Sequence, residues 1–266
     1  MAHYIPPNEL MGFYLTKSEF YDGVAVRYNA NPINAPSRCE AGPCGKEYTL
    51  EHALTCSYGG NRILRHDLVK HAVQAVATAA LGSSQSRVEL EPWLIRKGAL
   101  APNGRVCQEG LKTDLLLTGL DPIITRTYVD IRVPYPDTTT SKRKPLPQIL
   151  KEHESEKITK YRAICETHPH LQGSFQPFVV TTDGVLGPCA QQVVQQLVNH
   201  LCDKWKRKTR GEVMAWVRAR LSVAVVRAVS ACIRGNRRRP AAEGWEVGFN
   251  DAAALGPLLS NSARPE

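Results

Sequence analysis

Three cysteines and one histidine lie close together in the first quarter of the chain, and their spacing constrains the fold more than any other feature. The pattern is Cys39-x4-Cys44-x7-His52-x3-Cys56. Three thiolates and one imidazole form a closed tetrahedral set for zinc, with no position left for a catalytic water. Cys39 fits least well, because four residues separate it from Cys44. The pattern predicts a structural zinc site that stabilises its own small loop, against the alternative of unrelated buried cysteines and a surface histidine.

The other cysteines are scattered, mostly among apolar neighbours, and we expect plain buried thiols at Cys107, Cys165, Cys189, Cys202 and Cys232. The N-terminus carries no basic-then-apolar leader, so a reducing compartment is favoured over disulfides. No apolar run approaches the roughly 20 residues that span a bilayer. We therefore expect a soluble intracellular protein of the nucleus or cytoplasm, without a membrane partner.

The pattern of apolar residues after the cysteines mixes helices with short strands. Helical spacing predicts helices over residues 62–81, 149–166, 188–207 and 211–235. Short apolar segments with turn-rich borders predict strands in "PWLIRKGA", "TDLLLTGL", "TYVDIRVPY" and "FQPFVVTT". This order predicts an α/β fold in which helices flank a central sheet.

The net charge of +9 is concentrated near the C-terminal end. Residues 204–239 hold twelve Lys or Arg and one acid, Glu212, a balance of +11 that leaves the rest of the chain at about −2. A basic segment beside a nearly neutral body favours a nucleic-acid partner, DNA or alternatively RNA. A solvated helix face is the other interpretation. The candidate phosphate contacts at the start of the segment are Lys204, Lys206, Arg207, Lys208 and Arg210.

Two acidic residues belong to otherwise apolar strands. Asp114 begins "DLLL" and Asp130 interrupts "YVDIRV". A carboxylate in such a strand is unfavourable unless it is paired or binds a cation. Magnesium accepts one or two carboxylates together with waters and a substrate phosphate, and would activate water for in-line hydrolysis. Glu91, with Glu89 nearby, is a candidate third oxygen donor.

Two lysines follow on the expected helix over residues 149–166. Lys157 and Lys160 lie in "SEKITKY", and Lys157 shares a helix face with Tyr161. An ammonium near the metal would orient the attacking water and offset charge on the phosphate. The alternative is that Asp130 pairs with an arginine and that the lysines face solvent.

These motifs together resemble a known family. The block "CEAGPCGKEYTLEHALTCSYGGNRILRHD", followed by "EP", "KTDLLL", "YVDIRV", "KITKY" and "FQPFVVTTDGVLG", is similar to the C-terminal endonuclease region of non-long-terminal-repeat retrotransposon polyproteins. Members of that family carry a zinc knuckle and then a restriction-like nuclease of the PD-(D/E)xK superfamily. The similarity extends over residues 18–236.

The resemblance implies a restriction-endonuclease-like mixed sheet flanked by helices, and an enzyme that nicks target DNA so that a reverse transcriptase can prime from the new end. It implies zinc ligands at Cys39, Cys44, His52 and Cys56, magnesium ligands at Asp114 and Asp130, a helper acid at Glu91, and the active lysine at Lys157 with Lys160 as its rival. We expect an N-terminal helix and knuckle in residues 1–60 and a nuclease core in 61–203. The charge of residues 204–239 predicts a basic helical extension, and the Ala, Gly, Pro and Asn content of residues 240–266 predicts a disordered tail.

Three departures from the family pattern keep a second hypothesis open. Lys112 and Thr113 precede the first acid where the family has a basic residue and Pro, and Arg132 occupies the usual position of the strand lysine. The third departure is the connection from Asp130 to Lys157, which contains the basic "SKRK" and is longer than usual. The chain also contains no polymerase motif. The alternative function is a nucleic-acid-binding remnant of the same fold without catalysis.

Arg65 and His66 open the first long helix, next to its positively polarised N-terminus. Contact with DNA is one interpretation of this pair. A structural lock between the knuckle and the helix is the other.

Overall fold

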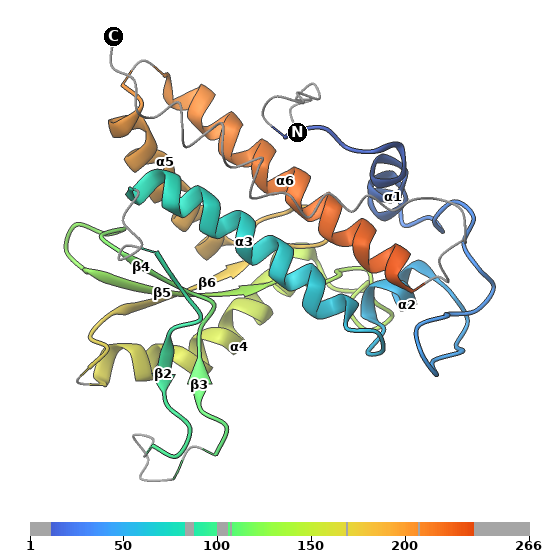
Figure 1. Ribbon diagram of the computed structural model, residues 1–266, viewed down its shortest axis with the longest axis horizontal. Coiled ribbons are helices and arrows are strands. Elements are labelled where there is room, and N and C mark those ends of the chain that lie inside the picture. The colour runs from blue at the N-terminus through green and yellow to red at the C-terminus, as the bar shows by residue number, and fades with distance from the viewer. Residues whose placement is uncertain are drawn as a thin grey trace.

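The computed structural model describes residues 12–82, 88–99, 106, 108–168, 170–206 and 208–236. Its centre is a mixed sheet flanked by helices (Figure 1), which confirms the predicted α/β class. The strands of this sheet, in spatial order, are β1 (Val88–Leu90), β4 (Leu115–Thr118), β5 (Arg126–Arg132) and β6 (Ser174–Val179). Neighbouring strands are antiparallel except β5 and β6, which run parallel. The helices are α1 (Lys17–Arg27), α2 (Leu50–Thr55), α3 (Asn61–Leu81), α4 (Leu146–Thr167), α5 (Pro188–Lys204) and α6 (Arg210–Gly235).

The central strand β5 is buried on both faces, and its side chains alternate between two hydrophobic cores. Val129 and Ile131 point into the larger core with α3, α5 and α6. Tyr128 points to the opposite face, where it joins the smaller core beneath α4. Because side chains along a strand alternate with period two, Asp130 lies on the same face as Tyr128. The fold therefore directs Asp130 toward α4.

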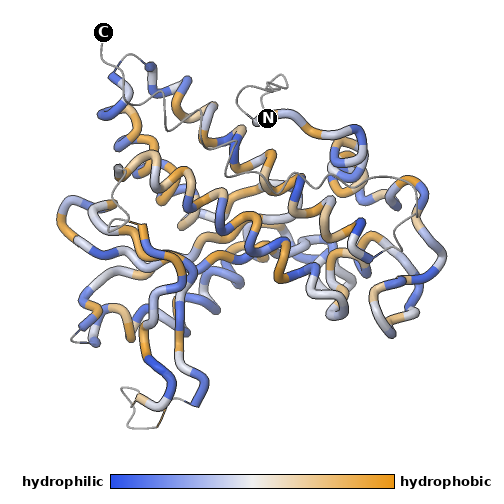
Figure 2. Tube along the Cα trace, in the orientation of Figure 1, coloured by the Kyte–Doolittle hydropathy of each residue, from blue (hydrophilic) through white to orange (hydrophobic). Residues whose placement is uncertain are grey.

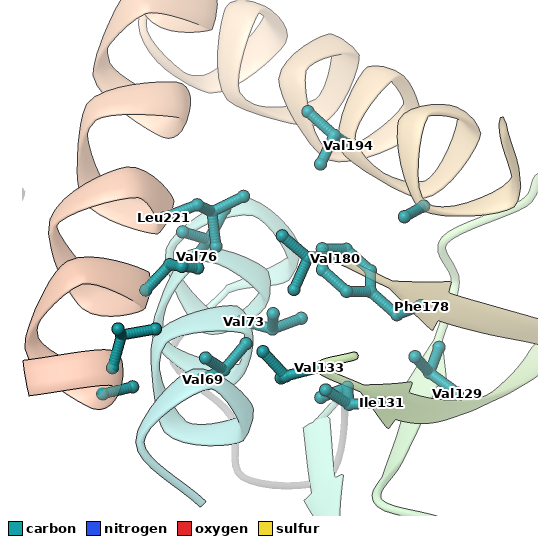
Figure 3. Close-up of a cluster of buried hydrophobic side chains, with 14 of the residues drawn as sticks. Val69, Val73, Val76, Val129, Ile131, Val133, Phe178, Val180, Val194 and Leu221 are labelled. Carbon is teal, nitrogen blue, oxygen red and sulfur yellow. The ribbon is translucent and has the colours of Figure 1, made fainter. Parts of the chain in front are cut away.

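The larger core lies between the sheet and three helices. Figure 3 shows Val69, Val73 and Val76 of α3 facing the valine and isoleucine side chains of β5, with Val194 of α5 and Leu221 of α6 closing the cluster. The apolar residues on α3 recur at intervals of three and four, as a helix that buries one face requires. Figure 2 shows apolar residues gathered where α3, α6 and the sheet meet.

Helix α6 is packed into the body of the molecule along much of its length. It lies against α3 and α1, and its buried residues belong to the same hydrophobic cluster as those of the sheet. Residues from α2 contribute to this cluster too. The predicted division of the chain at residues 61 and 204 stays a prediction, although one core joins the parts. The predicted tail from residue 240 lies outside the described residues.

The segment "PWLIRKGA" is a strand, but it does not join the central sheet. Its residues Trp93–Ile95 form β2, which pairs antiparallel with β3 (Leu111–Lys112) as a separate two-stranded sheet. The edge of the central sheet is taken by β1, which contains Glu89. Glu91 has φ near +50°, a left-handed conformation that ends β1 and redirects the chain before β2 begins. The apolar pattern does not reveal this turn.

The predicted helix over residues 188–207 ends earlier than expected, at Lys204. Among the residues that the structure describes, every helix is too short or too polar to cross a lipid bilayer.

Candidate functional site

The four residues of the Cys/His cluster (Cys39, Cys44, His52 and Cys56) converge in space. Cys39 Sγ lies 3.9 Å from Cys56 Sγ, and Cys56 Sγ lies 3.8 Å from Cys44 Sγ. Cys44 Sγ lies 3.3 Å from His52 Nε2, and the four ligand atoms all lie within 4.8 Å of one another. A tetrahedral site with Zn–S bonds of 2.3 Å has sulfur atoms about 3.8 Å apart. The cluster can hold a metal ion, and its donors and spacing are compatible with structural zinc.

Local structure brings these ligands together. Residues 38 and 47 form an antiparallel bridge, and Cys39 N–H donates to Lys46 O at 2.7 Å, so that the chain folds back between the first two cysteines and α2. Gly42 and Gly45 both adopt positive φ within this turn. Thr49 caps α2 by accepting from His52 N–H, and Cys56 follows directly at the end of that helix. The short helix therefore presents His52 and Cys56 from consecutive turns.

Burial favours the neutral thiol at Cys39. It raises the pKa of Cys39 to about 12. At Cys44 a hydrogen bond from the backbone N–H of Lys46 lowers the pKa instead. Zinc binds thiolates, so loading this site releases protons and links metal affinity to pH.

The Cys/His cluster is docked onto the end of α6 by a buried asparagine, Asn236. The Asn236 side chain donates from Nδ2 to Ala53 O at 2.7 Å, and its Oδ1 accepts from Asn61 Nδ2 at 3.1 Å. Cys39 Sγ lies 3.8 Å from the same Oδ1. Tyr48 adds a hydrogen bond of 2.8 Å to Ile233 O. The cluster is therefore fixed to residues that follow it by almost 200 positions.

A second group of polar side chains surrounds a cavity of about 250 Å³, which we call the α3–β5 cavity. It lies where the first turns of α3 meet β5 and the middle of α4. Both aspartates singled out from the sequence line it, together with one of the two candidate lysines. The full lining is Arg62, Arg65, His66, Asp114, Asp130, Ile131, Arg132, Val133 and Lys157.

Asp114 is held in place by two donors. Its Oδ2 accepts from Ile131 N–H at 2.6 Å and lies 3.1 Å from His66 Nε2. His66 Nδ1 lies 3.2 Å from Asp67 Oδ1, so this histidine bridges two carboxylates. Burial opposes a charge on His66, but Asp114 and Asp67 outweigh it and raise the pKa of the imidazole. His66 therefore fixes one aspartate of the cavity from α3.

Asp130 and Lys157 form an ion pair, with Oδ2 and Nζ separated by 2.6 Å. Burial raises the pKa of Asp130, the charge of Asp114 raises it further, and Lys157 opposes both effects. The two carboxylates are thus close enough to repel each other. A cation held between them would relieve that repulsion, and two carboxylates facing one cavity fit the donor preference of magnesium.

The remaining predicted catalytic residues occupy different surroundings. Lys157 lines the cavity, whereas Lys160 is exposed and places its Nζ 4.7 Å from the ring centroid of Tyr161. Glu91 is half exposed and pairs with Lys70 at 2.7 Å and Lys112 at 3.6 Å. Its backbone N–H donates to Asp114 O, so Glu91 adjoins the first aspartate through the main chain. The helper role of Glu91 stays a prediction.

Arg65 and His66 have separate roles. Arg65 is buried, and its Nη1 donates to Leu54 O at 2.8 Å, which ties α3 to α2. Arg62 and Arg132 also line the cavity, and Arg62 was not predicted as a site residue. Its signal is its position, one helical turn before His66. Arg62 is exposed and adds positive charge to a site that would receive phosphate, whereas Arg132 Nη1 forms an ion pair of 2.6 Å with Glu156 Oε2.

The predicted phosphate contacts at residues 204–210 lie at the other end of α3. Lys204 Nζ donates to Ala79 O at 2.9 Å. Residues 66 and 79 are separated by thirteen positions of helix, or about 20 Å. Lys206 is exposed, Lys208 pairs with Glu212 at 3.8 Å, and Arg210 contacts Asn199. Arg207 lies outside the described residues, and nucleic-acid binding by this group stays a prediction.

Other arginines of the basic segment face the N-terminal part of the chain. Arg234 Nε lies 2.7 Å from Asp22 Oδ2 on α1, and Arg227 Nη2 donates to Tyr14 O at 3.0 Å. These contacts contribute to the packing of α6. The thiols outside the Cys/His cluster are free, with Cys165 and Cys232 buried and Cys189 and Cys202 half buried. Cys107 lies outside the described residues.

No protein-family model matches this chain, and no curated protein matches it either.

Proposed function

We propose that this protein is a metal-dependent DNA endonuclease of retrotransposon origin that nicks its target by phosphodiester hydrolysis. The observation that carries the proposal is the convergence of Asp114, Asp130 and Lys157 on one cavity. These residues come from a loop, a strand and a helix that are far apart in the sequence. Two carboxylates with one lysine are the set that the PD-(D/E)xK resemblance implies.

Each residue of the α3–β5 cavity has a distinct task in this proposal. Asp114 and Asp130 would hold magnesium, which supplies a Lewis acid for the phosphate and lowers the pKa of the attacking water. Lys157 would offset negative charge that develops on the phosphate, because its ammonium already lies beside Asp130. His66 positions Asp114 through Nε2. Arg62, which is exposed at the cavity, would attract the DNA backbone electrostatically.

The Cys/His cluster has a structural task in the same proposal. Zinc with four protein ligands has no open position, so it takes no part in hydrolysis. It would fix the loop before α3. Arg65 connects α2, which carries His52, to the first turns of α3, which carry His66. The zinc knuckle therefore supports the cavity from a distance.

A nicking assay on supercoiled plasmid with magnesium tests the function. We expect Asp130→Asn to lower the rate by about 100-fold or more, because a ligand of the catalytic metal is lost. Asp203→Asn, an exposed carboxylate on α5, is the matched control and should retain the wild-type rate. If Asp130→Asn nicks as fast as wild type, the cavity is not the active site.

The same assay distinguishes the two candidate lysines by the nicking rates of their alanine variants. Lys157→Ala should lower the rate by roughly 100-fold, the effect of losing one electrostatic contact to the transition state. Lys160→Ala should leave the rate unchanged, because this side chain is exposed beside Tyr161. The reverse result would show that Lys160 is the active lysine.

A nucleic-acid-binding protein without catalysis is the second candidate function. The short ion pair between Asp130 and Lys157 favours it, because the pair neutralises one carboxylate without a metal. In that case wild type would bind DNA with strong salt dependence but would not nick it. Magnesium titration distinguishes the candidates, since only the enzyme requires the ion for turnover.

A further inference from the structure

The two-stranded sheet formed by β2 and β3 extends away from the body of the protein. Figure 1 shows this hairpin running past α4 and away from α3 and α6. Its strands pair through Trp93 with Lys112 and Ile95 with Leu111. The hydrophobic pattern of "PWLIRKGA" predicts a strand of the central sheet, but the segment extends outside that sheet.

The described part of the β2–β3 hairpin is basic and exposed. Arg96 and Lys97 follow β2 and are exposed, and Lys112 is half buried on β3. Glu109 is the acidic residue among the described positions of the hairpin. Figure 2 shows hydrophilic residues on both arms beyond the paired strands. The hairpin therefore presents a net positive charge to solvent.

Trp93 places an exposed aromatic ring at the base of the hairpin. Its side chain is 43% exposed, which is unusual for so large an apolar ring. Lys112 Nζ lies 4.2 Å from the centroid of that ring, a cation–π contact. A Cβ at Gly110 would lie 2.4 Å from the Trp93 ring, so glycine lets the two strands close around the indole. The exposed ring and the cation are held in a fixed arrangement.

The base of the hairpin is attached directly to the α3–β5 cavity. Thr113 N–H donates to Pro92 O at 3.3 Å, and Glu91 N–H donates to Asp114 O at 2.9 Å. The hairpin thus begins beside an aspartate of the proposed active site. Strands rise about 3.3 Å per residue, so Arg96 and Lys97 lie roughly 10 to 15 Å farther out. A ligand bound along the hairpin would therefore lie close to Asp114 at its base.

We propose that the β2–β3 hairpin binds duplex DNA by entering its major groove, next to the phosphate that the cavity would cleave. The major groove of B-form DNA is wide enough for a two-stranded β-ribbon, whereas that of A-form RNA is too deep and narrow. Arg96 and Lys97 supply contacts to phosphates or guanine edges, and Trp93 packs against the groove wall. This inference rests on the proposed function for its position beside a scissile phosphate, but DNA binding by the hairpin does not require cleavage.

Binding of labelled duplex DNA without added divalent cation tests the proposal, because no strand is cut under this condition. The test variant is Arg96→Ala/Lys97→Ala. The matched control is Lys17→Ala/Arg27→Ala, which removes one lysine and one arginine from the exposed surface of α1. Affinity is measured from about 50 to about 200 mM salt. We expect the hairpin variant to reduce the slope of log affinity against log salt by about 2, and the control to retain the wild-type slope.

Two outcomes would overturn the proposal. Equal slopes for wild type and hairpin variant would show that Arg96 and Lys97 do not contact the backbone or bases of DNA. An equal loss on duplex RNA of the same sequence would show general electrostatic attraction rather than groove insertion. Thermal unfolding of both double variants should match wild type, since all four side chains are exposed.

The same measurements distinguish this proposal from the proposed function. If Asp130→Asn nicks plasmid normally but the hairpin variant loses its salt slope, the cavity assignment fails and the hairpin assignment stands. If Asp130→Asn abolishes nicking and the hairpin slope is unchanged, only the hairpin assignment fails.

Discussion

The Cys/His cluster and the α3–β5 cavity are both groups of metal-ligand side chains, but they satisfy their polar atoms in different ways. In the cluster the four ligand atoms face one another within 4.8 Å. In the cavity each aspartate faces a cationic or polar donor of the protein itself, His66 for Asp114 and Lys157 for Asp130. The first arrangement can enclose a metal ion on all sides. The second keeps charged groups beside open space, as a site that exchanges ligands requires.

The difference predicts that stability depends on the cluster and activity on the cavity. A closed structural site adds the binding free energy of its ion to folding. A catalytic site holds like charges close together, which lowers stability for the sake of function. Variants of the cluster should therefore mainly lower the free energy of unfolding, and variants of the cavity should mainly lower the nicking rate.

Loss of a cluster ligand should have the largest effect. Zinc contributes about 10–16 kcal/mol to small structural sites, as much as the whole free energy of unfolding of a typical domain. We expect Cys56→Ser to lose zinc and to unfold well below the wild-type temperature, as should wild type treated with chelator. Cys202→Ser, a half-buried thiol outside the cluster, is the control. Wild-type protein purified with zinc but holding far less than one ion per chain would contradict the assignment.

Asn236→Ala should have the next largest effect. The substitution leaves Asn61 Nδ2 and Ala53 O without their buried partner, and each unsatisfied group costs about 1–3 kcal/mol. Denaturant unfolding should show a loss of about 2–4 kcal/mol, while zinc content stays at the wild-type level. Asn199→Ala on the exposed face of α5 should change stability by less than about 0.5 kcal/mol. Equal effects would indicate that the cluster does not depend on its contact with α6.

His66→Ala should affect activity more than stability. The imidazole fixes Asp114, and loss of such an outer partner typically lowers metal affinity or activity by about 10- to 100-fold. The rate should recover partly at high magnesium, because Asp114 itself remains. His66→Gln keeps a donor in the cavity and should retain more activity than the alanine variant. No dependence on magnesium would assign His66 a role in packing alone.

Asp130→Asn should have the smallest effect on stability. The change removes an ion pair and leaves the ammonium of Lys157, which is only partly buried, without its partner. It also relieves burial of the Asp130 charge and its repulsion by Asp114. These contributions oppose each other, so we expect the free energy of unfolding to change by less than about 1 kcal/mol in either direction. A loss as large as that of Cys56→Ser would remove the distinction between the two sites.

The two sites also differ in how far the sequence predicts them. The Cys/His cluster lies within one short segment, so its spacing alone identified all four residues that converge in space. Asp130 and Lys157 were identifiable as candidates because an acid in an apolar strand is unusual. Asp130 and Lys157 pair because side chains alternate between the two faces of β5, and Asp130 lies on the face that α4 covers. The role of His66 required the packing angle of α3 on the sheet, which no local pattern encodes.

The fold was predictable to a similar degree. The long helices and the central strands follow from periodicity, because each buries one regular face. The β2–β3 hairpin was missed because its apolar residues match a central strand, while the left-handed conformation of Glu91 that redirects the chain has no simple sequence signal. The burial of α6 was not predicted. The positive charge of this segment favoured a surface helix, although valines recur on its inner face.

The contact between Cys39 and Asn236 has a consequence for the order of events during synthesis. The ribosome finishes the last cluster ligand 180 residues before it reaches Asn236, and at about 5–20 residues per second that interval is roughly 10 to 40 s. Throughout this period the nascent loop has no contact with α6 to hold its folded shape. Zinc binding on the ribosome would provide that shape. The surface that α6 contacts would then be formed before α6 is synthesised.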